Sequence, residues 1–317
     1  MATQELKLKH DGAVGVPADT SLRSRVRGLV PDAPRELASA ALRRVLGSRW
    51  PSIGFRHIDQ TPISALSKSK LFEPELKLLP LFTLKPGSVF DVGANIGEYT
   101  YVLGKTVGLE NVYAIEPVPR LCSRLRALFP KAHVLEMALS DAAGTLALKT
   151  PIVRGSPLWT RSTLERFIDD GETGAVLEQV PVVPLDSLCE QLQVRDVTCL
   201  KIDVEGHEEN VIRGALGILR SCHPVLLVEI EQRHHLKPIS ELFSWIQTQG
   251  YHGAFFDSQV MSLRSIEEFS VDRDQQLSNL GNGHYINNFL FHQELSAKTM
   301  ADIVDRAAMK NGSPVIR

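Results

Sequence analysis

The chain has 317 residues, enough for two average domains or for one elaborated α/β domain. Apolar residues make up 43% of it and charged residues 23%, a composition that excludes a disordered or collagen-like chain. The 35 Lys and Arg residues nearly balance the 37 Asp and Glu residues, so we expect no general nucleic-acid binder.

Three features bear on the cellular compartment. No apolar run reaches the ~18 residues that a membrane span needs. The first residues, Met1–Lys9, lack the apolar core of a secretory signal. The cysteines form no CxxC pair, which is typical of buried thiols in a reducing compartment; they are Cys122, Cys189, Cys199 and Cys222. The sequence therefore predicts a cytoplasmic globular protein without a transmembrane segment.

The N-terminal quarter of the chain differs in charge from the rest. Residues 1–80 hold 13 Lys and Arg against 8 Asp and Glu. The first ~30 residues show little periodicity, which is typical of a mobile segment. Pro34–Leu46 predicts a short helix whose basic face could contact an anionic partner or a membrane surface, although a solvated face is commoner. Apolar residues over 63–82 predict a helix that precedes the next domain and packs on it. We therefore expect an N-terminal extension, 1–80, that is partly mobile and partly helical.

From Ser88 onward, short apolar runs alternate with helical patterns. The candidate strands are Val89–Val92, Val112–Ile115, Val134–Ala138, Val197–Ile202, Val225–Ile230 and Tyr285–Phe291. The candidate helices cover about 97–107, 120–129, 211–219 and 239–246. Such alternation predicts a mostly parallel sheet covered by helices on both faces. We place this α/β domain at 81–295 and a tail or short helix at 296–317.

A glycine-rich turn follows the first candidate strand. Its sequence, Asp91-Val-Gly-Ala-Asn-Ile-Gly97, has GxxxG spacing, without the GxGxxG of dinucleotide-binding turns or the lysine of a phosphate-binding loop. Gly93 and Gly97 allow the backbone to approach a ligand, and Gly97 allows close packing of the new helix against the strand. Asp91 would repel a diphosphate but could accept a hydrogen bond from an ammonium group.

Polar residues also follow the next two candidate strands. Glu116 ends the second strand, where a carboxylate can accept hydrogen bonds from both hydroxyls of a ribose. Ser140 and Asp141 follow the third strand, where a carboxylate could bind the exocyclic amine of adenine. Each acid alone could be a loop residue or a helix cap. Together they indicate a nucleoside that carries a cationic amino-acid arm and no phosphate, a description that fits S-adenosylmethionine.

Six segments within about 85–292 resemble the FkbM-type methyltransferases. They are Val89-Phe-Asp-Val-Gly-Ala-Asn-Ile-Gly-Glu-Tyr-Thr100, Ala114-Ile-Glu-Pro117, Ala138-Leu-Ser-Asp141, Leu185-Asp-Ser-Leu188, Leu200-Lys-Ile-Asp-Val-Glu-Gly-His-Glu208 and Asn288-Phe-Leu-Phe291. The resemblance implies a Rossmann-like class I methyltransferase fold, with a seven-stranded, mostly parallel sheet whose last strand is antiparallel. It also implies O-methylation of a hydroxyl on a sugar, glycolipid or natural product, with S-adenosylmethionine as the cofactor.

The resemblance assigns parts of the cofactor to particular positions, and makes 81–295 the methyltransferase domain. The residues that would surround the methionine part are Asp91, Gly93, Asn95 and Gly97. Glu116 would hold the ribose, and Ser140 with Asp141 would lie along the adenine. Asp203, at the end of the fourth strand, would face the reacting methyl group.

The expected chemistry requires a general base, because a sugar hydroxyl is a poor nucleophile until its proton is being removed. Asp203, Glu205 and His207 lie together after the fourth strand and are the candidate catalytic residues. His207 is attractive because histidine titrates nearest to working pH, although it could equally be a hydrogen-bonded histidine at a helix start. Asp203 could be the base or could orient acceptor and cofactor, and Glu205 could cap the following helix.

Two acids near the fifth strand are candidates for binding the acceptor. Glu229 and Glu231 alternate at its end, so one of them would point into the cleft. Asp203 and Glu229 could together hold a divalent cation, but no ligand spacing is apparent and we expect no bound metal. The adjacent His234 and His235 are expected to be solvated rather than to bind a metal.

The segment from Pro151 to Pro181 is longer than ordinary loops. It contains Trp159 and Arg161, and tryptophan faces can stack on sugar rings. We expect it to form part of the acceptor site or a lid, although a surface insertion is an equal alternative.

Two other classes of protein remain open. A nicotinamide-dependent oxidoreductase also has acids at strand ends and glycine turns, but the GxxxG spacing and Asp91 count against it. A non-catalytic module could keep the cofactor pocket without turnover, which the intact Asp203–Glu208 segment disfavours. For the leading hypothesis we expect a small-molecule or glycan hydroxyl acceptor.

Overall fold

The structure is a computed structural model that describes residues 75–82, 86–168, 171–279 and 285–310. All of these residues belong to one compact unit, Phe55–Arg317. The helix and the mobile segment that we predict before residue 50 lie outside them. Within the described ranges, no helix has both the length and the apolar character needed to cross a bilayer.

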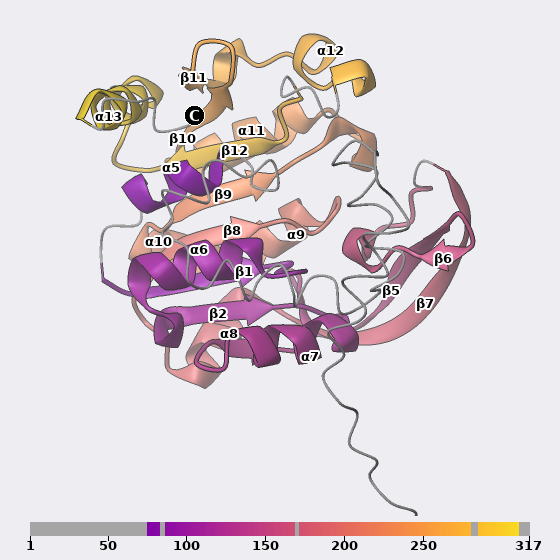
Figure 1. Ribbon diagram of the computed structural model, residues 1–317. Helices are drawn as coiled ribbons and strands as arrows, with labels where there is room; N and C mark the ends of the chain where they lie inside the picture. Colours follow the sequence, from indigo (N-terminus) through magenta and orange to yellow (C-terminus); the bar gives the residue numbers. More distant parts are fainter. Residues whose placement is uncertain (1–74, 83–85, 169–170, 280–284, 311–317) are drawn as a thin grey trace, which may run out of the picture. The chain divides into compact units, whose positions relative to one another are not determined.

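The core of the described part is an eight-stranded sheet with the order β11-β10-β12-β9-β8-β1-β2-β3 (Figure 1). Its strands are β1 (Ser88–Val92), β2 (Val112–Ile115), β3 (His133–Leu135), β8 (Val197–Ile202), β9 (Val225–Glu229), β10 (His252–Asp257), β11 (Ser262–Ser265) and β12 (Asn288–His292). β3, β2, β1, β8 and β9 pair in parallel, whereas β12 runs antiparallel to both β9 and β10. The mostly parallel sheet with an antiparallel last strand confirms the predicted fold class.

The predicted number of strands, seven, is wrong by one. β11 adds an antiparallel strand at the edge, paired with β10. Met261, in the turn between them, has a left-handed φ of 57°. Leu263 is the one buried apolar residue of β11, so the strand lacks an apolar run. β10, its partner, is also absent from the strands that we predict, although its residues Gly253–Phe256 are buried.

Side chains of the central strands alternate between two helical layers. One layer consists of α8 (Leu185–Leu192), α9 (Glu208–Arg213), α10 (Leu216–Cys222) and α11 (Ile239–Thr248). The other consists of α5 (Glu75–Phe82), α6 (Glu98–Val107), α7 (Pro119–Leu128) and α13 (Ala297–Lys310). In β1, for example, Phe90 packs in the first layer and Val89 in the second. Because both faces are covered, the parallel strands read as continuous apolar runs.

A second sheet, with the order β4-β7-β5-β6, lies beyond the carboxyl ends of β1, β2 and β8 (Figure 1). Its strands are β4 (Ala138–Leu139), β5 (Gly144–Val153), β6 (Ser156–Pro157) and β7 (Glu172–Val183). The predicted third strand is therefore split between two sheets, with its end in β4. The segment that we predict as a long loop, Pro151–Pro181, begins and ends within the β5–β7 hairpin instead.

The single helix predicted over 211–219 is broken into α9 and α10. At the break, a Cβ on Gly214 would lie 2.1 Å from the carbonyl oxygen of Ser140. The backbone of residue 214 thus packs directly on the turn after β4. Asp186 of α8 accepts the N–H groups of Gly217 and Ile218 at 2.7 and 2.9 Å, which satisfies free donors at the start of α10.

We predict that Gly214→Ala destabilises the protein by about 1–3 kcal/mol, because the new methyl group and the carbonyl of Ser140 cannot occupy the same space. Gly144→Ala is the matched control, since a Cβ there meets nothing within 4 Å. Chemical denaturation of both variants measures the difference. Equal unfolding midpoints for the two would contradict the prediction.

Candidate functional site

A cavity lies at the carboxyl ends of β1, β2 and β8, the edge of a parallel sheet at which ligands bind in α/β folds. Half of the residues predicted from the sequence line it, namely Gly93, Asn95, Glu116, Trp159, Asp203, Glu205 and His207. The other half do not border it, namely Asp91, Gly97, Ser140, Asp141, Arg161, Glu229 and Glu231. The strand-end residues therefore divide into a cavity wall and a supporting set behind it.

The turn after β1 touches the turn after β8. Gly93 has a φ of +80°, and a Cβ on it would lie 1.8 Å from the carbonyl oxygen of Asp203, so no larger residue fits. The N–H of Asp203 in turn donates to the carbonyl of Val92 at 2.9 Å. A Cβ on Gly97 would meet the side chains of Leu125 and Phe129. This glycine therefore allows close packing beside α7, and not, as we predict, close packing of the new helix against the strand.

Asn95 joins the turn after β1 to two other parts of the wall. Its N–H donates to Glu116 Oε2 at 2.8 Å, and its Nδ2 donates to the carbonyl of Thr160 at 3.1 Å. Its Oδ1 is buried and has no hydrogen-bond partner among the described residues. A buried acceptor left without a donor costs about 1–3 kcal/mol. A ligand with an ammonium or hydroxyl group at this point would remove that cost.

Glu116 is a buried carboxyl group in the cavity wall. Oε1 accepts the N–H of Val118 at 2.9 Å, and Oε2 accepts that of Asn95. Burial raises the pKa of Glu116 to about 7, although these two hydrogen bonds act to lower it. The carboxyl group therefore changes its charge near neutral pH.

Asp91 lies behind the wall, inside the sheet. Its carboxylate accepts the hydroxyl of Thr100 at 2.5 Å. Burial raises the pKa of Asp91 to about 6, and the hydrogen bond from Thr100 and the charge of Lys201 oppose that rise. Asp91 is 1% exposed, so its charge is held by the protein's own groups.

Lys201 of β8 is a fully buried cation that sequence reasoning missed. It lies opposite Asp91 in the parallel register, and its Nζ donates to Asn288 Oδ1 at 3.0 Å. The same Nζ lies 3.7 Å from Glu229 Oε2 and 4.6 Å from the centre of the Tyr99 ring. The sequence does contain a signal for this role, namely a lysine within the apolar run of a central strand. Burying an unpaired cation there would cost too much free energy, so a partner is expected.

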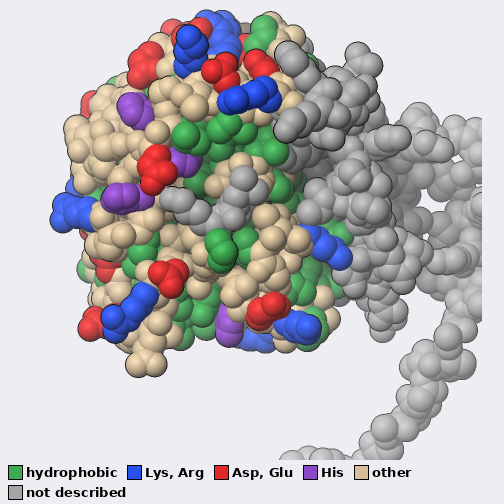
Figure 2. Space-filling view, turned by 90° about the vertical axis from the view of Figure 1, so that its left-hand side faces the viewer, with side chains coloured by type: hydrophobic (Ala, Val, Ile, Leu, Met, Phe, Trp, Pro, Cys, Tyr) green, Lys and Arg blue, Asp and Glu red, His purple; other side chains and the backbone are tan. Residues whose placement is uncertain are grey.

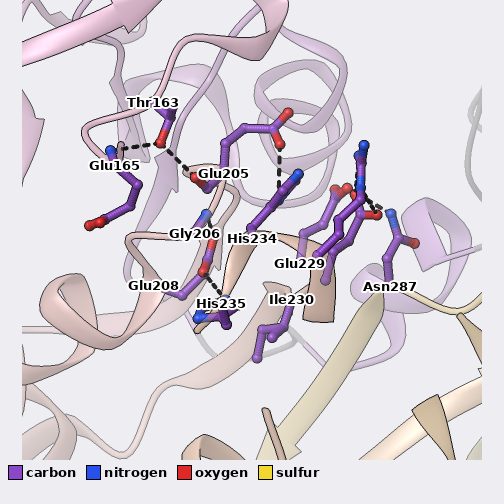
Figure 3. Close-up of polar contacts among 12 residues, drawn as sticks. Thr163, Glu165, Glu205, Gly206, Glu208, Glu229, Ile230, His234, His235 and Asn287 are labelled. Carbon is purple, nitrogen blue, oxygen red and sulfur yellow. Dashed lines mark hydrogen bonds and ion pairs between the residues drawn. The ribbon is translucent and has the colours of Figure 1, made fainter. Parts of the chain in front are cut away.

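The turn after β8 is held by two histidines (Figure 3). Nδ1 of His234 lies 3.3 Å from Glu205 Oε2, and Nε2 of His235 lies 3.0 Å from Glu208 Oε2. The ring of His234 also stacks on Phe167, with centroids 4.5 Å apart. The prediction that both histidines are solvated is therefore wrong.

Glu205 has a left-handed φ of +53° and a half-buried side chain. Burial, together with the nearby Asp203 and Glu231, raises its pKa well above the ordinary value. The prediction that Glu205 caps the following helix is wrong, because no described side chain caps the start of α9. Glu208 Oε1 accepts the N–H of Gly206, in the turn before that helix, at 2.9 Å.

The donor atoms of Glu205, Glu231 and His234 all lie within 4.8 Å of one another. Both oxygens of Glu231 are already engaged by Arg233, at 2.7 and 3.0 Å, and Oε2 also accepts the hydroxyl of Tyr285 at 2.5 Å. Burial favours the neutral form of Glu231, but these hydrogen bonds lower its pKa overall. An internal cation thus already balances this group of side chains.

Residues 158–168, which we name the roof segment, cover the cavity. Trp159 and Leu164 pack on a small apolar cluster that includes Leu148 and Val180. The guanidinium of Arg120 lies 5.3 Å from the centre of the Trp159 ring. Thr163 Oγ1 donates to the carbonyl of Glu205 at 2.6 Å, which fastens the roof segment to the turn after β8 (Figure 3).

His207 connects the roof segment to the turn after β4. Its Nδ1 lies 2.7 Å from Glu165 Oε1, and its Nε2 lies 3.0 Å from Ser140 Oγ. Ser140 Oγ donates to Asp141 Oδ1 at 3.2 Å. Glu165 was missed by sequence reasoning, because 42 residues separate it from His207 and no motif surrounds it.

The charge of the cavity favours a cationic ligand. Its lining includes Glu116, Asp203 and Glu205, and contains no Lys or Arg. On the face shown in Figure 2, which is turned by 90° from Figure 1, acidic and basic side chains are interspersed and neither forms a continuous patch. That face lies on the side of the amino ends of the strands, away from the cavity (Figures 1 and 2), so the acidic character described here is a property of the cavity lining itself.

The sheet order, the reversed β12 and the cavity at the strand ends define a Rossmann-like class I methyltransferase fold. The model of the methyltransferase FkbM domain matches residues 91–252, about half of the chain. The protein belongs to the FkbM methyltransferase family.

Hexuronic acid methyltransferase AglP of Haloferax volcanii is 27% identical over 191 residues, which cover 59% of this chain and 70% of that protein. A solved FkbM methyltransferase from Methylobacillus flagellatus is 16% identical, with a TM-score of 0.40 over 80% of this chain and 60% of that one. The O-methyltransferase from Bacillus cereus in complex with SAH is 10% identical, with a TM-score of 0.39 over 86% and 96%. The chain therefore spans about 60% of the length of the solved M. flagellatus protein.

We predict that Thr100→Val costs more stability at pH 8 than at pH 5. Asp91, with a pKa of about 6, is protonated at pH 5 and ionised at pH 8, and a buried acid with a raised pKa loses stability as the pH rises through that value. Removing the hydroxyl raises the pKa further, so the loss becomes larger, about 1.5–3 kcal/mol at pH 8.

Thr106→Val in the same helix is the control, since the Thr106 hydroxyl donates to the neutral carbonyl of Val102 at 2.9 Å. Urea denaturation at both pH values measures the two costs. An equal cost of Thr100→Val at pH 5 and pH 8 would refute the role given to Asp91.

Proposed function

We propose that the protein is an S-adenosylmethionine-dependent O-methyltransferase that methylates a hydroxyl of a sugar or sugar-containing small molecule. The observation that carries the proposal is the acidic cavity at the strand ends, with the unpartnered Oδ1 of Asn95 in its wall. Membership of the FkbM family and the similarity to a protein named as a hexuronic acid methyltransferase support the acceptor class.

The cavity wall suits S-adenosylmethionine in charge and in hydrogen-bonding groups. Asn95 Oδ1 would accept a hydrogen bond from the ammonium group of the methionine part. Each oxygen of Glu116 accepts one backbone N–H and keeps acceptor capacity for a ribose hydroxyl. The absence of a side chain at Gly93 lets the turn rest on the carbonyl of Asp203, which brings these groups together. Ser140 and Asp141, which we predict to lie along the adenine, do not border the cavity, so they are not part of this wall. When bound, the cofactor supplies a methyl group that its sulfonium already activates.

The remaining task of the protein is to align the acceptor hydroxyl and to receive its proton. Asp203 and His207 line the same cavity and are the proposed groups for this task. Glu205 is less suited as a base, because its raised pKa favours the neutral form and its carboxyl group already faces His234. Trp159, in the roof segment, is the proposed surface for the sugar ring. Arg161, Glu229 and Glu231 do not border the cavity, so we propose only supporting roles for them.

We predict that Glu116→Ala weakens the binding of S-adenosylmethionine about 10- to 100-fold, because two ribose hydroxyls lose their acceptor. With a pKa of about 7, Glu116 is ionised above neutral pH, where it accepts hydrogen bonds best. The ratio of the wild-type and variant affinities should therefore shrink as the pH falls from 8 to 6. Isothermal titration calorimetry measures both affinities.

Glu136→Ala is the control, because Glu136 lies just after β3 but is exposed and paired with Arg126. It should bind S-adenosylmethionine like the wild type. NADH, titrated separately, should not bind. Binding of NADH in place of the sulfonium cofactor would overturn the proposal in favour of an oxidoreductase.

We predict methyl transfer from labelled S-adenosylmethionine to a hexuronate-containing oligosaccharide. Asp203→Ala should lower this transfer about 100-fold or more, within the range of general-base contributions, with cofactor affinity retained. Trp159→Ala should instead raise the KM for the acceptor, because the roof segment loses a ring face. Mass spectrometry locates the methyl group on oxygen.

Glu190→Gln, an exposed acid of α8, is the control and should leave both parameters unchanged. Cofactor binding by the wild type without transfer to any sugar hydroxyl would favour a binding module. Full activity of Asp203→Ala would remove that residue from the catalytic set.

A further inference from the structure

The ring of His207 is fixed at both nitrogens by side chains from different parts of the chain. Glu165 belongs to the roof segment, and Ser140 follows β4. The distances are 2.7 Å from Nδ1 to Glu165 Oε1 and 3.0 Å from Nε2 to Ser140 Oγ. His207 and Ser140 are 5% and 3% exposed, and His207 lines the cavity.

The two partners are not equivalent, because their hydrogen-bonding capacities differ. An ionised carboxylate can only accept, so Nδ1 must carry the proton in its bond to Glu165. A neutral ring then has its lone pair on Nε2, 3.0 Å from Ser140 Oγ, and the one proton of that hydroxyl can go either to Nε2 or to a neighbouring acceptor. Ser140 has a second acceptor, Asp141 Oδ1, at 3.2 Å. Its hydroxyl can therefore turn to Asp141 when Nε2 takes up a proton.

The position of Glu165 is itself fixed by the roof segment. Its N–H donates to Thr163 Oγ1 at 3.0 Å, and the same hydroxyl donates to the carbonyl of Glu205 at 2.6 Å. Asn95 Nδ2 holds the preceding turn through the carbonyl of Thr160. The carboxylate thus reaches His207 only with the roof segment seated on the turns after β1 and β8.

We infer that Glu165 is a positioning residue that sets the tautomer of His207, so that Nε2 receives the proton of the acceptor hydroxyl. This inference rests on the proposed function and extends it. With the Ser140 hydroxyl turned to Asp141, the Nε2 lone pair takes the proton of the acceptor hydroxyl as the oxygen forms its bond to the methyl group and the carbon–sulfur bond of the cofactor breaks. The imidazolium that forms lies between Glu165 and Ser140, and its Nε2–H then donates to Ser140 Oγ. The roof segment thereby supplies both a wall for the acceptor and the group that orients the base.

The first test separates orientation from binding. Glu165→Ala should lower kcat about 10- to 100-fold, a part of what a general base contributes, with acceptor KM and cofactor affinity unchanged. Glu165→Gln keeps an acceptor oxygen without the charge and should fall between the wild type and Glu165→Ala. Glu190→Gln again serves as the exposed control. A change confined to KM would contradict an orienting role.

The second test observes the tautomer directly and needs no turnover. Proton–nitrogen correlation spectra of protein labelled with ¹⁵N-histidine report which nitrogen carries the proton, and His207→Asn identifies the signals of residue 207. In the wild type, the neutral ring should carry its proton on Nδ1. In Glu165→Ala it should shift toward Nε2, the form preferred by an unconstrained imidazole.

The two readouts distinguish failure of this inference from failure of the proposed function. A neutral ring protonated on Nε2 in the wild type, or a tautomer unchanged in Glu165→Ala, overturns the inference even if methyl transfer is observed. The Nδ1–H tautomer, lost in Glu165→Ala, supports the positioning even if no sugar is methylated. In that case the proposed function is what fails.

Discussion

The contact between the turns after β1 and β8 is the constraint on which the whole site depends. These strands are neighbours in parallel, so their carboxyl ends meet at one edge of the sheet. The missing side chain at Gly93 lets the first turn rest on the carbonyl of Asp203. This contact places Asn95 where its N–H donates to Glu116, and it places Asp203 in the lining of the cavity. A wall built from three strand ends needs no long loop to bring its polar groups together.

The same edge of the sheet concentrates negative charge, and the protein manages that charge in two ways. Behind the wall, Asp91 and Glu229 share the field of Lys201, so their charges are compensated within the fold. In the wall, Glu116 and Glu205 have raised pKa values because burial opposes their ionisation. Burial of these carboxyl groups costs free energy when they are ionised. A bound cationic ligand would offset part of that cost, so the wall favours a cation.

The elements predicted correctly from the sequence are those with a strong local signal. β1, β2, β8 and β9 are apolar runs because both of their faces are buried, and the residues at their ends follow from chain order alone. The β5–β7 hairpin was missed because its side chains are only half-buried and carry no such run. Glu165 and Lys201 were missed for another reason. Their roles arise from partners 42 and 87 residues away, which no local pattern encodes.

The second sheet and the roof segment come from one continuous insertion in the chain, between β3 and β8 of the main sheet. No described strand of this insertion pairs with a strand of the main sheet. The insertion contacts the cavity wall through side chains and single hydrogen bonds. Its length and composition can therefore change over evolutionary time without altering any strand register. Under the proposed function, the residues of the roof segment that face the acceptor could vary in this way, while Asn95 and Glu116, at the ends of strands of the main sheet, would keep the cofactor wall unchanged.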